Sequence, residues 1–368
     1  MKKSMLKSSI ALFLCALLLF PPFIPRAYAA TAPSVSAESA VLYQPDTESF
    51  PFEKQADTPL PMASTTKIMT ALTVLSLCSP TETVTVPKEA VGVEGTSAYL
   101  QENEELTVED LLYALLLQSA NDAAATLAIH ASGTQAAFVN EMNGLAKKMG
   151  LTRTHFENPH GLPSDGHYTT ARELAYMTRA ALLDPVIATI VSTKVHRVTT
   201  SHRTLTFANH NKLLRLSEDA VGMKTGFTKA SGRCLVGAAI RDGVLLISVT
   251  LNAPSDWQDH MRMWEYGFSL FERREILSAK EYCKNILVFG GIKPFVSATN
   301  HVSFSAVLPK AATVSLRANV LPLPLLPIKE GQELGELAVY ANGKEIGHLP
   351  LYATESLSPL SKRKLFHK

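Results

Sequence analysis

The sequence is poor in cysteine. Only four cysteines occur in 368 residues, and one of them, Cys15, lies in the apolar N-terminal segment. The other three, Cys78, Cys234 and Cys283, are an odd number and are widely separated. This spacing is typical neither of a disulfide framework nor of a cysteine-based zinc site. We therefore expect three buried free thiols.

The chain also lacks an excess of charge of either sign. It has 35 basic and 33 acidic residues, for a formal net charge of +2. Four of the basic residues precede residue 30, so removing them from the 35 leaves 31 basic against 33 acidic residues. Binding to nucleic-acid phosphates requires a basic surplus. Nucleic acid is therefore not an expected partner.

Long apolar runs are missing as well. The longest near the N-terminus, Ile10 to Phe20, has 11 residues, whereas a membrane-spanning helix needs about 20. Before this run lie Lys2, Lys3 and Lys7, and after it comes the small-residue site Ala27-Tyr28-Ala29. This layout predicts a secretory signal peptide over residues 1–29 and favours it over a retained anchor or lipidation at Cys15. We expect the rest of the chain to act outside the cytoplasm.

The hydrophobic periodicity predicts two domains that differ in secondary structure. Residues 64–150 are mostly helical in pattern, with a capping box predicted at Thr107–Asp110, and a further helix is expected over 171–183. Alternating runs at 234–240 and 244–251 predict a hairpin turning at 241–243, followed by a closing helix over 257–271. An antiparallel sheet with packed helices, an α+β domain, is therefore expected for residues 35–274.

From residue 278 onward the pattern changes to short strands separated by proline and glycine. Examples are 286–289, 302–307, 314–320 and 337–340, and Asn342-Gly343 is a hairpin turn before 345–349. We expect a small all-β sandwich domain over 278–355. A short basic tail, residues 356–368, follows it.

Ser64 and Lys67 form the first motif that carries chemistry, Ser64-Thr65-Thr66-Lys67. Residues three apart on a helix lie on one face, so the amine can reach the hydroxyl. A serine hydroxyl needs a base to become a nucleophile. Lys67 can serve only if burial or a neighbouring cation lowers its pKa. Alone, the pattern also fits a helix-capping serine beside a surface lysine.

Two further motifs lie far along the chain. Ser119-Ala120-Asn121 sits between two apolar helices, where its hydroxyl and amide could face a cleft or merely cap a helix. Lys224-Thr225-Gly226 leads into the predicted hairpin. A glycine on an edge strand permits pairing with a substrate backbone, and the lysine supplies a positive charge for an anion.

The three motifs together, in this order, resemble the penicillin-recognising serine enzymes. Within that group the chain is similar to the low-molecular-mass D-alanyl-D-alanine carboxypeptidases, penicillin-binding proteins of the S11 serine peptidase family. The likeness runs from about residue 39 to 271, and more faintly to 327–331. Matching stretches are 62–72, 106–112, 119–124, 158–162 and 222–228. The resemblance implies a serine β-lactamase/DD-peptidase-like first domain that removes the terminal D-alanine of peptidoglycan stem pentapeptides.

The resemblance also implies a role for each motif residue. Ser64 would form the acyl-enzyme, Lys67 would take its proton, and Ser119 with Lys224 would pass a proton to the leaving D-alanine. Asn121 would hold Lys67 and the acyl amide. The strand residues Lys224, Thr225, Gly226, Phe227 and Thr228 would bind substrate, with backbone N–H groups of Ser64 and Phe227 as the oxyanion hole. β-Lactam antibiotics would be covalent inhibitors, and neither metal nor cofactor is expected.

Some positions depart from the family pattern. Phe227 stands where some relatives have histidine, and Arg233 and Arg262 are the candidates for an additional substrate-carboxylate arginine. The tail is short and contains Pro359, which disfavours a terminal amphipathic helix. Peripheral contact with the outer face of the cytoplasmic membrane therefore stays open.

Three alternative functions remain. A β-lactamase needs a carboxylate for the deacylating water, for which Glu157 is the candidate. A zinc peptidase could use side chains among His155, His160, Asp165 and His167, but their spacing matches no common ligand pattern. A non-catalytic penicillin-binding receptor would not require the complete set of motif residues.

Overall fold

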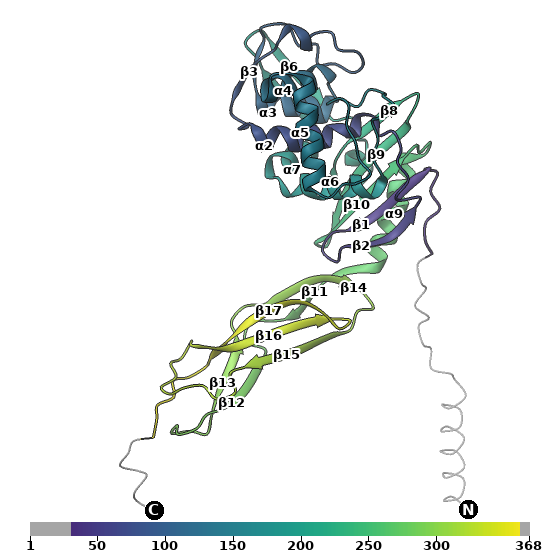
Figure 1. The fold of residues 1–368 in the computed structure, drawn as a ribbon. Helices are drawn as coiled ribbons and strands as arrows, with labels where there is room; N and C mark the ends of the chain where they lie inside the picture. The colour runs from purple at the N-terminus through teal and green to yellow at the C-terminus, as the bar shows by residue number, and fades with distance from the viewer. Residues whose placement is uncertain (1–30, 361–368) are drawn as a thin grey trace, which may run out of the picture. The chain divides into compact units, whose positions relative to one another are not determined.

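The computed structural model describes residues 31–360 (Figure 1). The predicted signal peptide lies outside these residues, as does the end of the predicted tail, 361–368. The first structural part is built on an antiparallel sheet in the order β2-β1-β10-β9-β7, with β8 also paired to β9. Its strands are β1 Ser39–Gln44, β2 Ser49–Lys54, β7 Ala220–Gly222, β8 Thr225–Thr228, β9 Gly232–Arg241 and β10 Val244–Leu251. The predicted hairpin is confirmed by the β9–β10 pairing.

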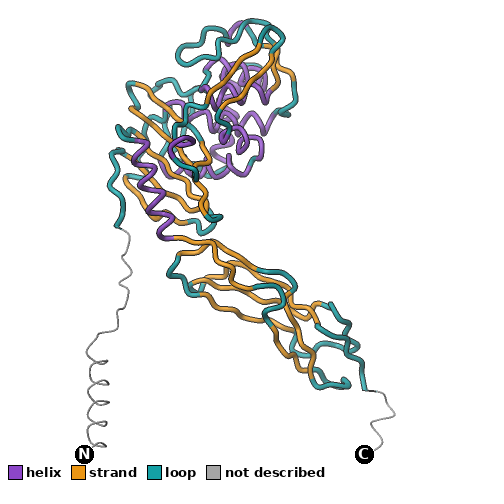
Figure 2. Tube along the Cα trace, turned by 180° about the vertical axis from the view of Figure 1, so that it is seen from behind, coloured by secondary structure: helices purple, strands orange, loops and turns teal. Residues whose placement is uncertain are grey.

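Helices cover both faces of this sheet. The closing helix α9, Asp256–Leu270, packs on β9 and β10 and is visible from behind in Figure 2. On the other face α6, Ala171–Leu183, contacts β1 and β10. Accordingly, all six residues of β1 are buried. The α+β prediction is confirmed.

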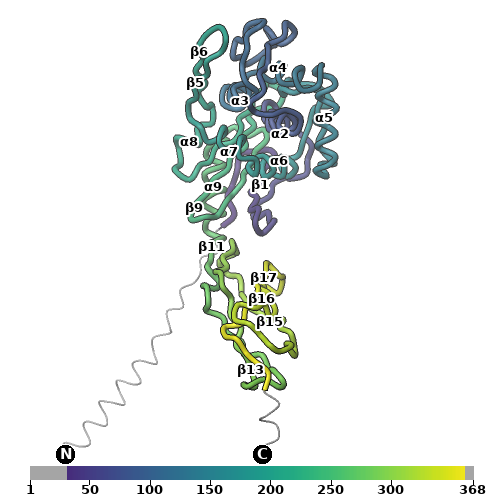
Figure 3. Tube along the Cα trace, turned by 90° about the vertical axis from the view of Figure 1, so that its left-hand side faces the viewer, coloured from purple at the N-terminus to yellow at the C-terminus, as the bar shows by residue number. Residues whose placement is uncertain are grey.

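Most of the remaining helices form a cluster beyond the sheet, which Figure 3 shows from the side. They are η1 Ala63–Thr66, α2 Lys67–Leu77, η2 Lys88–Ala90, α3 Val108–Tyr113, η3 Ala114–Gln118, α4 Asn121–Ser132, α5 Gln135–Lys148 and α7 Pro185–Ser192. The short helix α8, Leu213–Leu216, instead packs against β7, and its Leu213 belongs to the core beneath α9. The capping box at Thr107 and Asp110 is present. No single helix within residues 31–360 is long and apolar enough to span a membrane. Helices α6 and α7 taken together reach the necessary length and apolar composition, but the chain bends by 102° between them.

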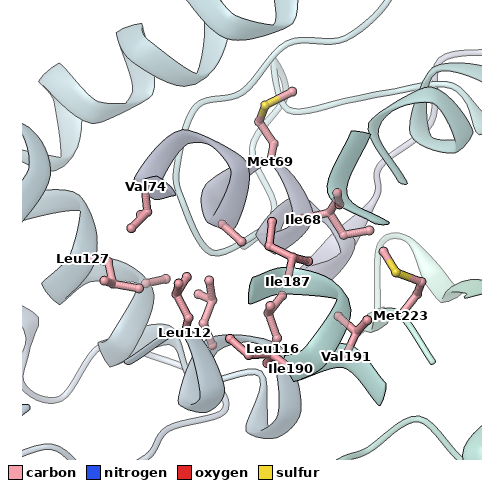
Figure 4. Packing of buried hydrophobic residues seen from close by; sticks show 14 of the residues in the cluster. Ile68, Met69, Val74, Leu112, Leu116, Leu127, Ile187, Ile190, Val191 and Met223 are labelled. Atoms are coloured by element: carbon pink, nitrogen blue, oxygen red, sulfur yellow. The ribbon is translucent and has the colours of Figure 1, made fainter. Parts of the chain in front are cut away.

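Buried aliphatic side chains fix helix α2 in this cluster. Ile68 and Met69 are at most 1% exposed. Figure 4 shows Ile68 near Ile187 of α7, with Leu112 and Leu116 from the α3–η3 segment in the same core. The start of α2 is thereby held rigidly, which matters because Ser64 and Lys67 lie there.

The second part contains strands only. Its five-stranded sheet has the order β12-β13-β17-β16-β15, and β11 pairs separately with β14. The bounds are β11 Phe271–Leu277, β12 Cys283–Leu287, β13 Phe295–Asn300, β14 Phe304–Pro309, β15 Val314–Val320, β16 Glu333–Ala341 and β17 Lys344–Ala353. The all-β prediction is confirmed, as is the turn between β16 and β17.

Several local expectations differ from the structure. The closing helix ends at Leu270, and Phe271 begins β11, which runs past predicted boundary 274 to Leu277 and pairs with β14. The domain bounds 35–274 and 278–355 stay predictions. Two small two-stranded sheets were not expected: β3 Thr83–Thr85 with β4 Glu105–Thr107, and β5 Val195–Thr199 with β6 Thr204–Ala208.

The expectation of three buried thiols is wrong for two cysteines. Cys234 is buried, but Cys78 is half-buried and Cys283 is exposed. Cys283 begins the edge strand β12, where alternate residues face solvent. Cys78 directly follows α2 at its C-terminal cap. Whether these thiols are buried depends on which face of the strand Cys283 lies on and on where helix α2 ends, and amino-acid composition reveals neither.

Candidate active site

A cleft of about 540 Å³ brings the three predicted motifs together. Ser64 and Ser119 line it together with Thr225, Gly226 and Phe227 of β8. Other lining residues come from segments that the motifs do not include: Thr96, Ala208, Asn209, His210, Lys212, Arg215, Arg233, Cys234, Asp256 and Trp257. The serine, the second hydroxyl and the edge strand therefore share one cavity.

Ser64 lies in a tightly constrained turn at the start of α2. Ala63 has a φ of +47°, which is unfavourable for an L-residue. The hydroxyls of Thr65 and Thr66 donate to the carbonyls of Met62 and Ala63 at 2.7 and 2.8 Å, which fixes the turn. Non-glycine residues in strained conformations concentrate at functional sites. The strain here is next to the predicted nucleophile.

Lys67 is completely buried behind Ser64. Its Nζ lies 3.1 Å from Ser64 Oγ. It also donates to Asn121 Oδ1 at 2.7 Å and to the carbonyl oxygen of His160 at 2.6 Å. The amine thus has three polar neighbours in fixed positions, one of which is the predicted nucleophile.

The two buried lysines have lowered pKa values. Burial lowers the pKa of Lys67 well below its usual 10.5, the charge of Lys224 lowers it further, and Asp122 opposes the shift. Burial lowers the pKa of Lys224 to about 7. These are the two causes, desolvation and a neighbouring cation, that the sequence analysis required for Lys67 to act as a base.

The loop 158–162 supplies the carbonyl that holds Lys67. Asn158 fixes the loop, because its Oδ1 accepts from Gly161 N at 2.7 Å and its Nδ2 donates to Leu162 O at 3.0 Å. Gly161 has a φ of +88°, and a Cβ there would lie 2.0 Å from Ala63 O. Only glycine therefore allows this loop to pack against the turn of Ser64.

Ser119 and Asn121 follow a π-helical turn, η3. Ser119 has left-handed backbone angles, φ 64° and ψ 31°, where the turn gives way to α4. The backbone N–H of Asn121 donates to Thr96 O at 2.7 Å, and its Nδ2 donates to Glu94 O at 2.5 Å. These bonds direct Oδ1 toward Lys67. Segment 94–98 was missed at the sequence level because it shows no catalytic motif.

The third motif places β8 beside the serine. Lys224 is 1% exposed, and its Nζ donates to Thr225 O at 2.9 Å. A Cβ on Gly226 would lie 3.0 Å from Ser64 N, so glycine permits the close approach of the strand. Among the strands within residues 31–360, β8 pairs with β9 alone, which leaves its other edge for a substrate.

The last two residues of β8 differ from each other. Phe227 lines the cleft and is 65% exposed. Thr228 shares a hydrogen bond with Ser231, Oγ1 to Oγ 2.8 Å, and is not part of the cleft lining. Its hydroxyl would have to exchange this partner to contact a substrate.

One wall of the cleft is basic. It contains Lys212, Arg215 and Arg233, whereas Asp256 is the one carboxylate in the lining. His210 also lines the cleft, but burial and the charge of Lys224 lower its pKa and so favour the uncharged imidazole. Arg233 forms an ion pair with Asp256 at 2.9 Å, which orients the guanidinium while its side chain remains 42% exposed. The other predicted arginine, Arg262, donates to Ser34 O and is outside the cleft lining. A positive wall suits a substrate that carries a carboxylate.

The residues of the alternative hypotheses have other partners. Glu157 is exposed and hydrogen-bonded to Ser164. His167 accepts from Glu157 N at Nδ1, so its Nε2 donates to Thr66. His155 Nδ1 lies 2.7 Å from Gly166 O, and His160 Nδ1 accepts from Leu162 N. In the described part of the chain, the cluster of possible metal ligands includes none of these histidines and not Asp165.

Comparison with known proteins identifies two matching family models. Residues 26–255 match the model described as D-alanyl-D-alanine carboxypeptidase, Peptidase_S11. Residues 271–358 match the model of the C-terminal domain of penicillin-binding protein 5.

Individual relatives cover most of the chain. The D-alanyl-D-alanine carboxypeptidase DacC of Escherichia coli is 33% identical, over 91% of this chain and 88% of its own. DacF of Bacillus subtilis is 28% identical, over 87% and 86% of the two chains. The crystal structure of penicillin-binding protein 5 from Haemophilus influenzae covers 89% of this chain and 99% of its own, with 27% identity and a TM-score of 0.66.

The role of Gly161 gives a direct test of the site geometry. In Gly161→Ala the added Cβ displaces Ala63 or the loop, and a displacement of about 1 Å at a reacting group costs on the order of a hundredfold in rate. We expect covalent labelling of Ser64 by a fluorescent penicillin to slow by about that factor.

Gly150→Ala is the matched control. Gly150 also has a positive φ, +74°, but nothing lies within 4 Å of the added Cβ. This variant should lose about 1 kcal/mol of stability and keep its labelling rate. Equal labelling rates in the two variants would show that the contact between residues 161 and 63 does not position Ser64.

Proposed function

The chain belongs to the D-alanyl-D-alanine carboxypeptidases of the S11 serine peptidase family, and from this premise we propose that it cleaves the terminal D-alanine from peptidoglycan stem pentapeptides through an acyl-enzyme on Ser64. The oxygen of Ser64 attacks the carbonyl carbon of the D-alanyl-D-alanine bond. The C–N bond breaks, D-alanine leaves as an amine, and water then hydrolyses the ester. These steps require neither a metal nor a cofactor.

The observation that carries this proposal is the environment of the Lys67 amine. A neutral amine has two N–H donors and one lone pair. Two acceptors, Asn121 Oδ1 and His160 O, lie 2.7 and 2.6 Å from Nζ. The lone pair is then left for the third neighbour, Ser64 Oγ, at 3.1 Å. A neutral Lys67 is therefore arranged to accept the proton of Ser64 as the nucleophile attacks.

The remaining residues are assigned to charge stabilisation and proton return. The backbone N–H groups of Ser64 and Phe227 form the oxyanion hole, a contribution of about 3–4 kcal/mol per donor in comparable hydrolases. Ser119, beside Lys224, passes the proton to the leaving nitrogen. Asn121 also holds the acyl amide.

Substrate binding is assigned to β8 and to the basic wall. The substrate backbone adds to the free edge of the strand alongside Gly226 and Phe227. Its terminal carboxylate is bound by Lys224, Thr225 and Thr228. Arg233 is a further candidate for this carboxylate because Asp256 holds its guanidinium at the cleft.

β-Lactam antibiotics fit the same site as covalent inhibitors. A β-lactam acylates Ser64 as the substrate does, but its remaining ring blocks the approach of water. The acyl-enzyme then persists. Slow deacylation separates this proposal from the β-lactamase alternative, for which Glu157 offers no support because it lies outside the cleft lining.

The decisive experiment for this function uses Ser64→Ala. We expect intact mass spectrometry after benzylpenicillin to show one adduct on the unaltered protein, mapped to the peptide of Ser64, and none on the variant. Release of D-alanine from a stem pentapeptide should fall to background. An adduct on another residue would refute the nucleophile assignment, and labelling without D-alanine release by the unaltered protein would favour a non-catalytic receptor.

The pH dependence of acylation tests the coupling of the two lysines. The rate falls at low pH because Lys67 must be neutral to accept a proton. Removing the positive charge in Lys224→Ala raises the pKa of Lys67. The acidic limb of the acylation profile should therefore move to higher pH.

Lys212→Ala serves as the control for this profile. Lys212 also lines the cleft, but it is not among the charges that shift the pKa of Lys67. The acidic limb of the acylation profile of Lys212→Ala should stay at the same pH as in the unaltered protein, even if substrate binding weakens. An acidic limb in Lys224→Ala that is unchanged, or that moves to lower pH, would contradict the proposed base.

We also propose that the exported chain works at the cell wall, in peripheral contact with the outer face of the cytoplasmic membrane. Support comes from exposed apolar side chains in the β domain, in the segments 287–295 and 321–325. They are Leu287, Phe289, Ile292, Phe295, Leu321, Leu323 and Leu325. The two segments adjoin, since a Cβ on Gly291 would lie 3.4 Å from Leu326 Cδ1.

Basic residues follow this apolar surface in the chain. The backbone N–H of Leu360 donates to Gly290 O at 2.7 Å, so the chain leaves the described structure beside the apolar segment. The sequence continues with Lys362, Arg363 and Lys364. An apolar surface that is followed in the sequence by basic residues suits a surface of anionic lipid, where each basic residue contributes about 1 kcal/mol.

Vesicle co-sedimentation tests this contact. The mature protein should sediment with vesicles that contain anionic lipid, and the double variant Phe289→Ser, Leu325→Ser should lose most of this binding. Leu183→Ser, at an exposed leucine in α6, is the control and should bind normally. No sedimentation of the unaltered protein, or an equal loss in the control, would overturn the proposed contact.

A further inference from the structure

Three side chains of different chemistry converge at the end of α2 opposite to the active site. Cys78 follows α2, Glu82 lies in the next loop, and His130 is in the last turn of α4. The thiol sulfur, a carboxylate oxygen and a ring nitrogen all lie within 4.8 Å of one another. The distance from His130 Nε2 to Glu82 Oε2 is 3.2 Å.

We propose that Cys78, Glu82 and His130 form a binding site for a zinc ion, with water as the fourth ligand. Tetrahedral zinc with bond lengths of about 2.0–2.3 Å places its ligand atoms about 3.5 Å apart. Small side-chain rotations bring the three atoms to that separation. The ion would take the place of the proton that now joins the imidazole and the carboxylate.

The backbone around the site is firmly held. Cys78 N donates to Val74 O at 2.8 Å, Glu82 N donates to Ser79 O at 3.1 Å, and Val108 N donates to Glu82 O at 2.9 Å. Helix α4 packs against α2, so His130 approaches from an independent element (Figure 3). A site built on fixed elements loses little conformational entropy when it binds an ion.

The carboxylate is also oriented by a neighbour. Glu82 Oε1 accepts from Ser79 N at 2.5 Å, which leaves Oε2 directed to His130. The pKa of Glu82 is lowered, first by the N–H of Ser79 and then by His130, so it is ionised at neutral pH. A ligand held by a second hydrogen-bonded group is the usual arrangement in metal sites.

The set of donor atoms selects the class of ion. Calcium and magnesium prefer oxygen ligands only, whereas one sulfur, one nitrogen and one oxygen suit zinc. The cysteine must lose its proton on binding, and its pKa is raised by burial and by Glu82. Zinc affinity should therefore increase with pH.

Sequence spacing alone does not reveal this site. Glu82 and His130 are 48 residues apart, and Cys78 and Glu82 do not form a common zinc pattern. The ion would join the C-terminal end of α2 to α4. Because Lys67 is the first residue of α2, the site would stabilise the helix that carries the catalytic base.

Zinc titration of the chelator-treated mature protein without a histidine tag tests the proposal. Competition with a coloured zinc indicator should give one ion per chain. Cys78→Ser and His130→Gln should each weaken the affinity by on the order of tenfold or more. With cobalt in place of zinc, a thiolate-to-metal charge-transfer band should appear and should be absent in Cys78→Ser.

Cys283→Ser is the matched control, because it removes an exposed free thiol elsewhere. It should leave the zinc affinity and the cobalt band unchanged. Circular dichroism of each variant confirms that it is folded. Failure of the unaltered protein to bind zinc, or equal binding by Cys78→Ser, would overturn the proposal. None of these readouts depends on peptidase activity.

Discussion

Two lysine amines are withdrawn from water beside a serine, and the rest of the candidate active site is arranged around them. An ammonium group inside a protein is costly unless it is paired or loses its proton. Here the amine of Lys67 lies between two amide-type acceptors and a hydroxyl, and none of these three hydrogen-bond partners is a carboxylate. Burial and the charge of Lys224 both favour the neutral form. Burial therefore favours a neutral Lys67, whose lone pair is available to accept a proton from Ser64.

The backbone is strained at or beside each of the three sequence motifs that form the site. Ala63, Ser119 and Met223 have positive φ values of 47°, 64° and 96°, and each either precedes or is a residue with a proposed catalytic role. Such conformations persist only when packing determines them. Gly161 and Gly226 complete the arrangement because each allows another backbone to approach the turn of Ser64. The apolar core beneath α2 supplies the rigidity that holds these strained segments in place (Figure 4).

Local signals in the sequence predict elements that local interactions determine. Helix α6, strand β10 and the capping box at Thr107 were found in this way, and the three motifs were placed in one cleft through a family resemblance. The π-helical turn before Ser119 was missed, since its i to i+5 hydrogen bonds have no residue signature. The basic wall around Arg215 and the loop that orients Asn121 were also missed. They depend on contacts between segments that are distant in the sequence, and the exposure of Cys283 depends on the phase of a strand.

The ionisation of Lys67 is the quantity on which this account rests. It can be measured by NMR, by following the ¹³Cε signals of labelled lysine through a pH titration and assigning them with Lys67→Arg and Lys224→Arg variants. The account predicts that the Lys67 signal titrates well below 10.5, the usual value, and that the amine is neutral in the working enzyme. Titration of Lys67 at its usual pKa in the folded protein would contradict the account.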